Sequence, residues 1–365
     1  MGYRNKGSWY RTPVNNLMSE YQIYAIRYAR KDDRRSSENF VGGDGPDTPM
    51  PLDFFVWALV SRDRTVIVDT GFDEKSGKPR GYAISRPVAE GLKQIDINPD
   101  GVKDVILTHM HWDHAGNHEL FPQARYHVQE REMHFCIGRC MCDPVQKRAY
   151  NAEDVSHIVR RHFEGRVVLH DSNSNFDDGI SLHWMGGHTE GLQVVRVKTR
   201  RGYVVLASDA SHYYANILQR RPFPVLFDVD QMLNGFSVIQ KLADSPSHII
   251  PGHDRQVLSL FPAARDGLDG VARLDVRCLH QARHGRGKRR LCGLLNLMRA
   301  RNRSSRRQGN PRHRIGLLPD QKRLHQIVIG HLHQGAGALD QITPKPRMCN
   351  QRRGHDKDRR RGEVG

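Results

Sequence analysis

The chain has 365 residues, a formal net charge of +17 and 38% hydrophobic residues. An ordinary globular protein has about 45–50% apolar residues, so we expect part of this chain to lie outside any packed core. No apolar run of about 18 residues occurs, which excludes an ordinary membrane-spanning helix, and residues 1–20 lack the apolar core of a secretory signal, so we expect a cytoplasmic location.

Short β-rich runs alternate with helical patterns between residues 21 and 276, and residues 1–20 are treated as an N-terminal extension. The predicted strands are Ile23–Ala29, Phe54–Val60, Thr65–Asp69, Val105–Thr108, Arg125–Gln129, Val167–Leu169, Leu182–Met185, Gln193–Lys198, Tyr203–Ser208 and His248–Pro251. The predicted helices are Arg86–Lys93, Gln129–Cys140, Val155–Phe163 and Asp230–Asp244. This alternation predicts one mixed α/β or α+β domain over residues 21–276.

Residues 277–365 differ from the rest in composition. They hold 23 of the 57 basic residues, 5 of the 40 acidic ones and none of the Phe, Tyr or Trp. A segment without large apolar side chains cannot easily offset its ordering entropy, so we predict a disordered, Arg-rich tail. A frameshifted or read-through end of a GC-rich gene would have this composition, and a functional basic tail is the alternative. Resequencing the 3′ end of the gene separates the two.

The strongest chemical signal is the segment VILTHMHWDHAGN, which contains His109, His111, Asp113 and His114 in the pattern HxHxDH. In an extended segment, residues two apart project to the same side, so His109 and His111 can bind one cation together. Asp113 and His114, in the turn that follows, can face a second cation. Imidazole and carboxylate donors suit Zn²⁺, so the pattern predicts a zinc site.

Three histidines and one carboxylate cannot complete two metal sites, so other segments must supply ligands. His188 in GGHTEG, Asp209 in LASDAS and His253 in IIPGHD each follow an apolar run and are flanked by glycine or small residues. Asp209 is our candidate for a bridging carboxylate, which would hold two ions about 3.5–4 Å apart. Such a pair lowers the pKa of a shared water toward about 7, so the implied reaction is hydrolysis.

These motifs, together with IVDTG at residues 67–71, resemble the metallo-β-lactamase superfamily, whose fold is an αββα sandwich with the metals at one edge between two sheets. The resemblance implies that Asp69 supports the metal loop without binding metal. It divides the ligands into His109, His111 and His188 for the first metal, Asp113, His114 and His253 for the second, and Asp209 as the bridge.

Within that superfamily the segments THMHWDHAGN, GGHTEG, SDAS and PGHD are more similar to the N-acyl homoserine lactonases, and the carboxylate of Asp113 at the second-metal position separates this branch from the cysteine-ligated β-lactamases. This resemblance implies a quorum-quenching hydrolase that holds two divalent ions, with Zn²⁺ as the expected metal. The implied substrate is a small-molecule lactone. A hydroxide bridging the metals would attack the lactone carbonyl, while Asp113 orients it or passes a proton to the departing alkoxide.

One position departs from the lactonase pattern. Those enzymes commonly have a tyrosine three residues after the bridging aspartate, where it polarises the lactone carbonyl. Here that position is His212, followed by Tyr213 and Tyr214. We expect at least one of these three residues to contact the substrate, with His212 and Tyr213 as the catalytic candidates and a packing role as the alternative.

Two other hydrolase classes share HxHxDH: glyoxalase II-type thioesterases and RNA-processing nucleases. The basic tail would give a nuclease affinity for phosphates, but it lacks the aromatic residues on which bases stack. Nucleic acid is therefore not the preferred substrate. A binding protein with a vestigial site is a third alternative, weakened by the presence of all seven candidate ligands. No sequence pattern indicates the oligomeric state or the preferred length of the acyl chain.

Overall fold

The computed structural model describes residues 19–42 and 47–279. The predicted N-terminal extension, apart from its last two residues, and the predicted tail, apart from residues 277–279, lie outside the described residues. Within the described ranges, no helix is long and apolar enough to cross a membrane.

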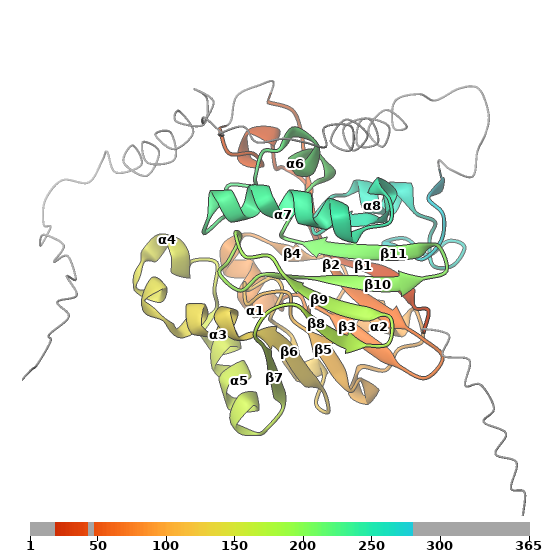
Figure 1. The fold of residues 1–365 in the computed structure, drawn as a ribbon, viewed down its shortest axis with the longest axis horizontal. Coiled ribbons are helices and arrows are strands. Elements are labelled where there is room, and N and C mark those ends of the chain that lie inside the picture. The colour runs from red at the N-terminus through yellow and green to blue at the C-terminus, as the bar shows by residue number, and fades with distance from the viewer. Residues whose placement is uncertain (1–18, 43–46, 280–365) are drawn as a thin grey trace, which may run out of the picture. The chain divides into compact units, whose positions relative to one another are not determined.

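Two β-sheets form the centre of the structure (Figure 1). In spatial order, the first contains β13 (Val271–Arg273), β1 (Gln22–Lys31), β2 (Leu52–Val60), β3 (Thr65–Val68), β5 (Asp104–Ile106), β6 (Arg125–Gln129) and β7 (Val167–His170), with β4 (Ala83–Ile84) paired to β1. The second contains β12 (Ile249–Pro251), β11 (Gly202–Ser208), β10 (Gln193–Thr199), β9 (Ile180–Trp184) and β8 (Ser174–Asp177).

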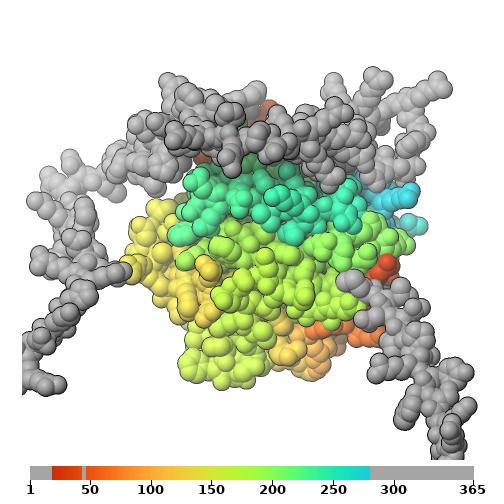
Figure 2. Space-filling model, in the orientation of Figure 1, coloured from red at the N-terminus to blue at the C-terminus, as the bar shows by residue number. Residues whose placement is uncertain are grey.

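Helices cover the outer face of each sheet. Those after strands of the first sheet are α1 (Glu74–Gly77), α2 (Val88–Lys93), α3 (Glu130–Ile137), α4 (Pro144–Lys147) and α5 (Ala152–Phe163). Those after strands of the second are α6 (Tyr214–Gln219), α7 (Val229–Leu242) and α8 (Gln256–Leu260). Buried residues of α2, α3 and α5 share one core with the first sheet, and those of α7 and α8 share the other with the second. Helix α7 contacts β11, and in Figure 2 the teal atoms of this part of the chain adjoin the green atoms of the second sheet. The predicted αββα sandwich is confirmed.

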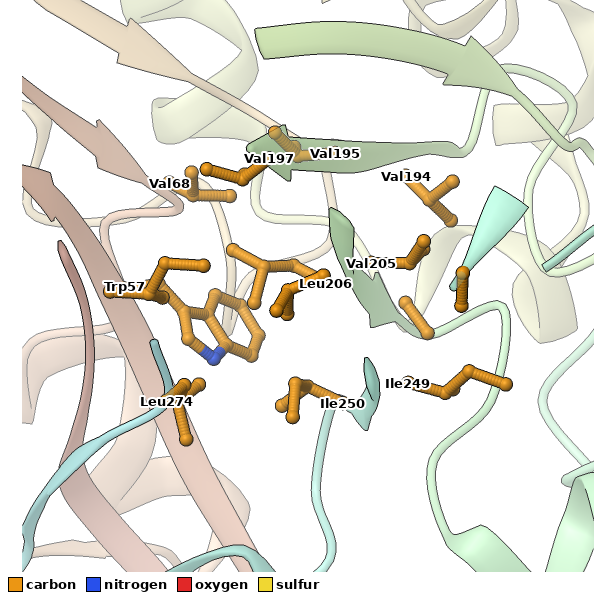
Figure 3. Close-up of a cluster of buried hydrophobic side chains, with 14 of the residues drawn as sticks. Trp57, Val68, Val194, Val195, Val197, Val205, Leu206, Ile249, Ile250 and Leu274 are labelled. Atoms are coloured by element: carbon orange, nitrogen blue, oxygen red, sulfur yellow. The ribbon is translucent and has the colours of Figure 1, made fainter. Parts of the chain in front are cut away.

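Strand β2 shows why the sheets stack. Its residues are buried on both faces, which accounts for the uninterrupted apolar run FFVWALV. The side chains alternate between the two hydrophobic cores: Phe55, Trp57 and Leu59 in one, Phe54, Val56 and Ala58 in the other. Trp57 lies in the core between the sheets, where Leu206 and Ile250 of the second sheet also lie (Figure 3).

The predicted strands and helices are all present, with ends that differ by up to three residues. The helix predicted to reach Cys140 ends at Ile137, because Gly138 adopts an extended conformation. The elements missed are β4, β8, β13, α1, α4, α6 and α8. Each spans at most six residues, too few for a hydrophobic period to show in the sequence.

Two pairs of parallel strands fix the position of the loops that carry the predicted ligands. Strand β3 pairs in parallel with β5, and β11 pairs in parallel with β12. The carboxyl ends of adjacent parallel strands meet at the same edge of a sheet. The loops that follow these strands therefore lie side by side and bring together IVDTG with HxHxDH, and Asp209 with His253.

Candidate metal centre

The structure brings all seven predicted ligands into groups that could hold metal ions. Within each group, the ligand atoms lie within 4.8 Å of one another. The groups are His109, His111, His188 and Asp209; Asp113, His114 and His253; and Asp209, His212 and His253.

The two carboxylate oxygens of Asp209 face different sets of histidines. Oδ2 is 3.1 Å from Nε2 of His188 and 3.8 Å from Nε2 of His109. Oδ1 is 3.0 Å from Nε2 of His253 and 3.3 Å from Nε2 of His114. Zinc bonds of about 2.0–2.1 Å in a tetrahedron place donor atoms about 3.3 Å apart. Asp209 thus has the geometry of a carboxylate shared between two ions.

Asp113 is the most exposed of the candidate ligands. Its side chain is 13% exposed, whereas those of His114 and His253 are 1% and 3% exposed. Its Oδ2 lies 3.6 Å from Nε2 of His114 and 3.9 Å from Nε2 of His253. The Tyr28 hydroxyl donates to the Asp113 carbonyl at 2.7 Å and fixes this turn. Solvent can therefore reach the centre beside Asp113.

Backbone carbonyls orient two of the histidines. Nδ1 of His188 lies 2.7 Å from the carbonyl oxygen of Val225, and Nδ1 of His253 lies 2.9 Å from that of Asp53. A carbonyl can only accept, so each Nδ1 must carry the proton and donate it. In the neutral ring, Nε2 then carries the lone pair, which is directed at Asp209 and available to a metal.

Asp69 orients His114 in the same way. Its Oδ2 is 2.8 Å from Nδ1 of His114 and accepts a hydrogen bond from the Thr108 hydroxyl, and its Oδ1 accepts one from the Thr108 amide. Burial raises the pKa of Asp69, and the contacts with His114 and Thr108 act against that rise. Asp69 belongs to none of the metal-binding groups found among the described residues.

Three ligand atoms of the site are buried and have no hydrogen-bond partner among the described residues: Nε2 of His109, Nε2 of His114 and Oδ1 of Asp209. A buried polar atom left without a partner costs about 1–3 kcal/mol, which a bound cation would remove. Burial and the neighbouring imidazoles also lower the pKa values of His109 and His111, so both rings are neutral and able to bind metal. The donor set therefore fits a pair of divalent ions.

His212 lies against the same centre. Its Nε2 is 3.1 Å from Oδ2 of Asp209, and its ring stacks on Phe223 with 3.7 Å between the ring centroids. Burial lowers the pKa of His212 to about 3. The imidazole is thus held in one orientation, with a nitrogen beside the Asp209 carboxylate.

Tyr213 points elsewhere. It is 1% exposed, and its hydroxyl donates to the carbonyls of Met50 and Pro51 at 3.4 and 3.3 Å. Of the two residues expected to contact the substrate, His212 therefore has a polar side-chain atom beside the metal ligands, and the phenol of Tyr213 is directed at backbone carbonyls.

A close backbone approach joins Asp209 to the His253 loop. The Gly252 amide donates to the carbonyls of Ser208 and Ser211. A Cβ atom on Gly252 would lie 2.8 Å from Oδ1 of Asp209 and from the carbonyl carbon of Ser208. Only glycine allows this approach without a shift of the loop.

We expect Gly252→Ala to lower zinc affinity about tenfold. The added Cβ atom would force the His253 loop away from Asp209, and this shift would change the distance between two of the candidate ligands. The measurement is competition with a chromophoric chelator. Gly101→Ala is the control, since a Cβ atom there meets nothing within 4 Å. Equal zinc affinities for the two variants would contradict the prediction.

Two residues at the site carried little sequence signal. Phe223 lies in a loop without a motif. Glu132 is fully buried in α3, and its spacing of three and four residues from Phe135 and Cys136 places it on the buried face of that helix. A glutamate on a buried face is unusual and was the one available cue.

Comparison with known proteins agrees with this geometry. Residues 53–253 match the family model of the metallo-beta-lactamase superfamily. N-acyl homoserine lactonase AiiA of Bacillus thuringiensis subsp. kurstaki is 24% identical over 226 residues, 57% of this chain and 84% of the relative. N-acyl homoserine lactonase AiiB of Rhizobium rhizogenes is 29% identical over 184 residues, 49% of this chain and 66% of the relative.

Solved structures show the same fold. A quorum-quenching N-acyl homoserine lactone lactonase aligns with a TM-score of 0.53 and 22% identity, over 66% of this chain and 94% of its own. AidC, a dizinc quorum-quenching lactonase in complex with a product, aligns with a TM-score of 0.51 and 14% identity, over 70% of this chain and 97% of its own.

Proposed function

The chain belongs to the metallo-beta-lactamase superfamily, and from that premise we propose that it opens the lactone ring of N-acyl homoserine lactones. Its fold and its histidine-rich site are those of a metal-dependent hydrolase. The names of the curated relatives and the carboxylate of Asp113 in the second group of donors support the lactone as substrate.

The observation that carries the proposal is the division of the Asp209 oxygens between two sets of histidines. One carboxylate that faces both sets allows two ions to act on one substrate carbonyl. The proposed ligands are His109, His111 and His188 for one ion, Asp113, His114 and His253 for the other, and Asp209 for both. Bound ions would supply Lewis acidity and lower the pKa of water, and the donor set favours Zn²⁺.

Asp113 is suited to handle the proton of the reaction. The attacking water gives up a proton, and the alkoxide formed when the acyl C–O bond of the ring breaks takes one up. The Asp113 carboxylate is the candidate ligand nearest to solvent, and its turn is fixed by the hydroxyl of Tyr28. It can therefore hold a proton beside the substrate without a change in the backbone.

We assign the substrate contact to His212. The stacking on Phe223 fixes the ring, and Nε2 faces the bridging carboxylate rather than the protein surface. With metal ions bound to both oxygens of Asp209, the Nε2–H of His212 would be free to donate to the reacting carbonyl and to stabilise the charge that develops on its oxygen. Tyr213 could take this role only by giving up its hydrogen bonds to Met50 and Pro51.

We expect His212→Phe to lower kcat about 100-fold, because phenylalanine keeps the stack on Phe223 but donates no hydrogen bond. His212→Tyr, which restores a donor, should recover part of that loss. Steady-state kinetics on a lactone, with metal content measured on the same samples, tests this. Unchanged kcat in His212→Phe would remove His212 from the reaction.

The substrate itself is tested by a pH-indicator assay on several acyl homoserine lactones, run beside a thioester and an RNA substrate. Each reaction is repeated after chelation and after the return of Zn²⁺. We expect lactone turnover that chelation abolishes and zinc restores. Turnover of the thioester alone would indicate a glyoxalase II-type enzyme, and RNA cleavage alone would indicate a nuclease.

A further inference from the structure

A buried carboxylate outside the ligand set joins the two loops that carry the first group of histidines. Glu132, on α3, is fully buried and accepts four hydrogen bonds. Its Oε1 accepts from the Met110 amide at 2.8 Å and the Tyr150 hydroxyl at 3.2 Å. Its Oε2 accepts from the Thr189 hydroxyl at 2.6 Å and the Gly191 amide at 3.1 Å. Both oxygens are therefore fully used by donors of the protein.

The positions of these donors explain what the carboxylate holds. Met110 stands between His109 and His111, and Thr189 directly follows His188. Glu132 thus binds the backbone or side chain next to each of the three histidines. Nδ1 of His111 and Nε2 of His188 lie 2.9 Å apart, so a small shift of either loop would change the separation of two ligand atoms.

Tyr150 adds a second contact to the same loop. Its hydroxyl donates to Glu132, and its ring packs edge-on against His111 with 4.7 Å between the centroids. The backbones of His111 and Tyr150 also form an isolated β-bridge. The ring of His111 is therefore fixed from one side by a side chain that Glu132 itself orients.

The third contact is steric. A Cβ atom on Gly191 would lie 2.1 Å from the backbone nitrogen of Glu132 and 2.4 Å from its Cα. The His188 loop therefore rests directly on the first turn of α3, and glycine is required at this contact. The loop has no freedom to move toward α3, and the hydrogen bonds to Glu132 prevent movement away from it.

We propose that Glu132 is a positioning residue for the metal centre: it holds the His109–His111 turn and the His188 loop at the separation that binding of the first metal ion requires. The inference rests on the metal centre proposed above and is independent of the lactone substrate. Groups that orient metal ligands from outside the coordination sphere change metal affinity about 10–100-fold when they are removed.

The sharpest variant is Glu132→Gln, which keeps the size and shape of the side chain. Glutamine has one acceptor oxygen and one amide nitrogen that only donates. Whichever way the glutamine amide turns, its nitrogen must face the backbone N–H of either Met110 or Gly191. A backbone N–H can only donate, so two donors would then face each other. We therefore expect the zinc affinity of the first site to fall about 10–100-fold in this variant.

Asp104→Asn is the matched control. Asp104 is also a buried carboxylate that accepts several hydrogen bonds, from Arg64, Arg125 and His127, but it lies at the start of β5, away from the ligands. Zinc dissociation constants come from chelator competition, and the thermal unfolding of the metal-free proteins is measured in parallel. We expect both variants to lose stability and Glu132→Gln alone to lose zinc affinity.

The spectrum of the cobalt-substituted protein provides a second readout, since its visible bands depend on ligand geometry. Altered bands in Glu132→Gln and unchanged bands in Asp104→Asn would support the proposal. Wild-type zinc affinity and wild-type bands in Glu132→Gln would overturn it.

If Glu132→Gln does not fold, Thr189→Val and Tyr150→Phe decide the question, because each removes one hydroxyl donor and retains the shape of the side chain. We expect each variant to weaken zinc binding several-fold. Wild-type zinc affinity in both variants would overturn the proposal. A wild-type protein that binds no zinc would refute the proposed metal centre, whereas a zinc-bound enzyme inactive on lactones would refute only the substrate.

Discussion

Asp209→Asn is expected to lower kcat/KM on the lactone about 1000-fold or more, equivalent to about 4 kcal/mol of transition-state stabilisation. Asparagine keeps the shape of the side chain but has one acceptor oxygen in place of two. It can serve the His188 side or the His253 side of the centre, not both. Zinc content should fall from two ions per chain to one or fewer, measured by elemental analysis.

Asp244→Asn is the control for this experiment. Asp244 accepts a hydrogen bond from the Tyr203 amide, near the start of β11, whereas Asp209 follows the end of the same strand. We expect Asp244→Asn to retain two zinc ions and wild-type turnover. Two tightly bound ions in Asp209→Asn would show that Asp209 does not bridge.

Asp69→Asn is expected to lower activity about 100-fold or more, although Asp69 binds no metal in our assignment. The oxygen of asparagine must face the Thr108 amide, so its NH₂ group faces Nδ1 of His114. Nδ1 then becomes the acceptor and the proton moves to Nε2, the atom that would bind metal. The second zinc ion should be lost, with little change in the thermal stability of the metal-free protein.

Asp73→Asn is a matched control from the same loop. Asp73 caps α1 by accepting a hydrogen bond from the Ser76 amide at 2.8 Å, and asparagine caps helices equally well. We expect it to retain both ions and full activity. If Asp69→Asn also binds two zinc ions, the tautomer of His114 does not control metal binding.

The local patterns of the sequence predicted much of this structure. Strand β2 is evident from its apolar run because both of its faces are buried, and α7 from its helical period. The HxHxDH motif places four donors within six residues, so their proximity is local and needs no knowledge of the fold. The remaining ligands follow apolar runs, and a resemblance to a family linked them to the motif.

The partners of those ligands could not be predicted in this way. Glu132 contacts Thr189, 57 residues away, and Nδ1 of His253 donates to the carbonyl of Asp53, 200 residues away. The choice between His212 and Tyr213 was also open, since both follow Asp209 closely. Our proposal that His212 contacts the substrate rests on its packing against Phe223 and on the carbonyls near Tyr213, which are tertiary contacts.

The sequence by itself determined the kind of donors, their chemistry and the positions along the chain of the strands that carry them. Side-chain type and hydrophobic period are local properties, so they can be recognised without the fold. The tertiary structure decided which nitrogen of His188 and of His253 faces a carbonyl, which oxygen of Asp209 faces which histidines, and that Glu132 joins two ligand loops. Those features depend on contacts between segments far apart in the chain, and they exist only after the two sheets have packed together.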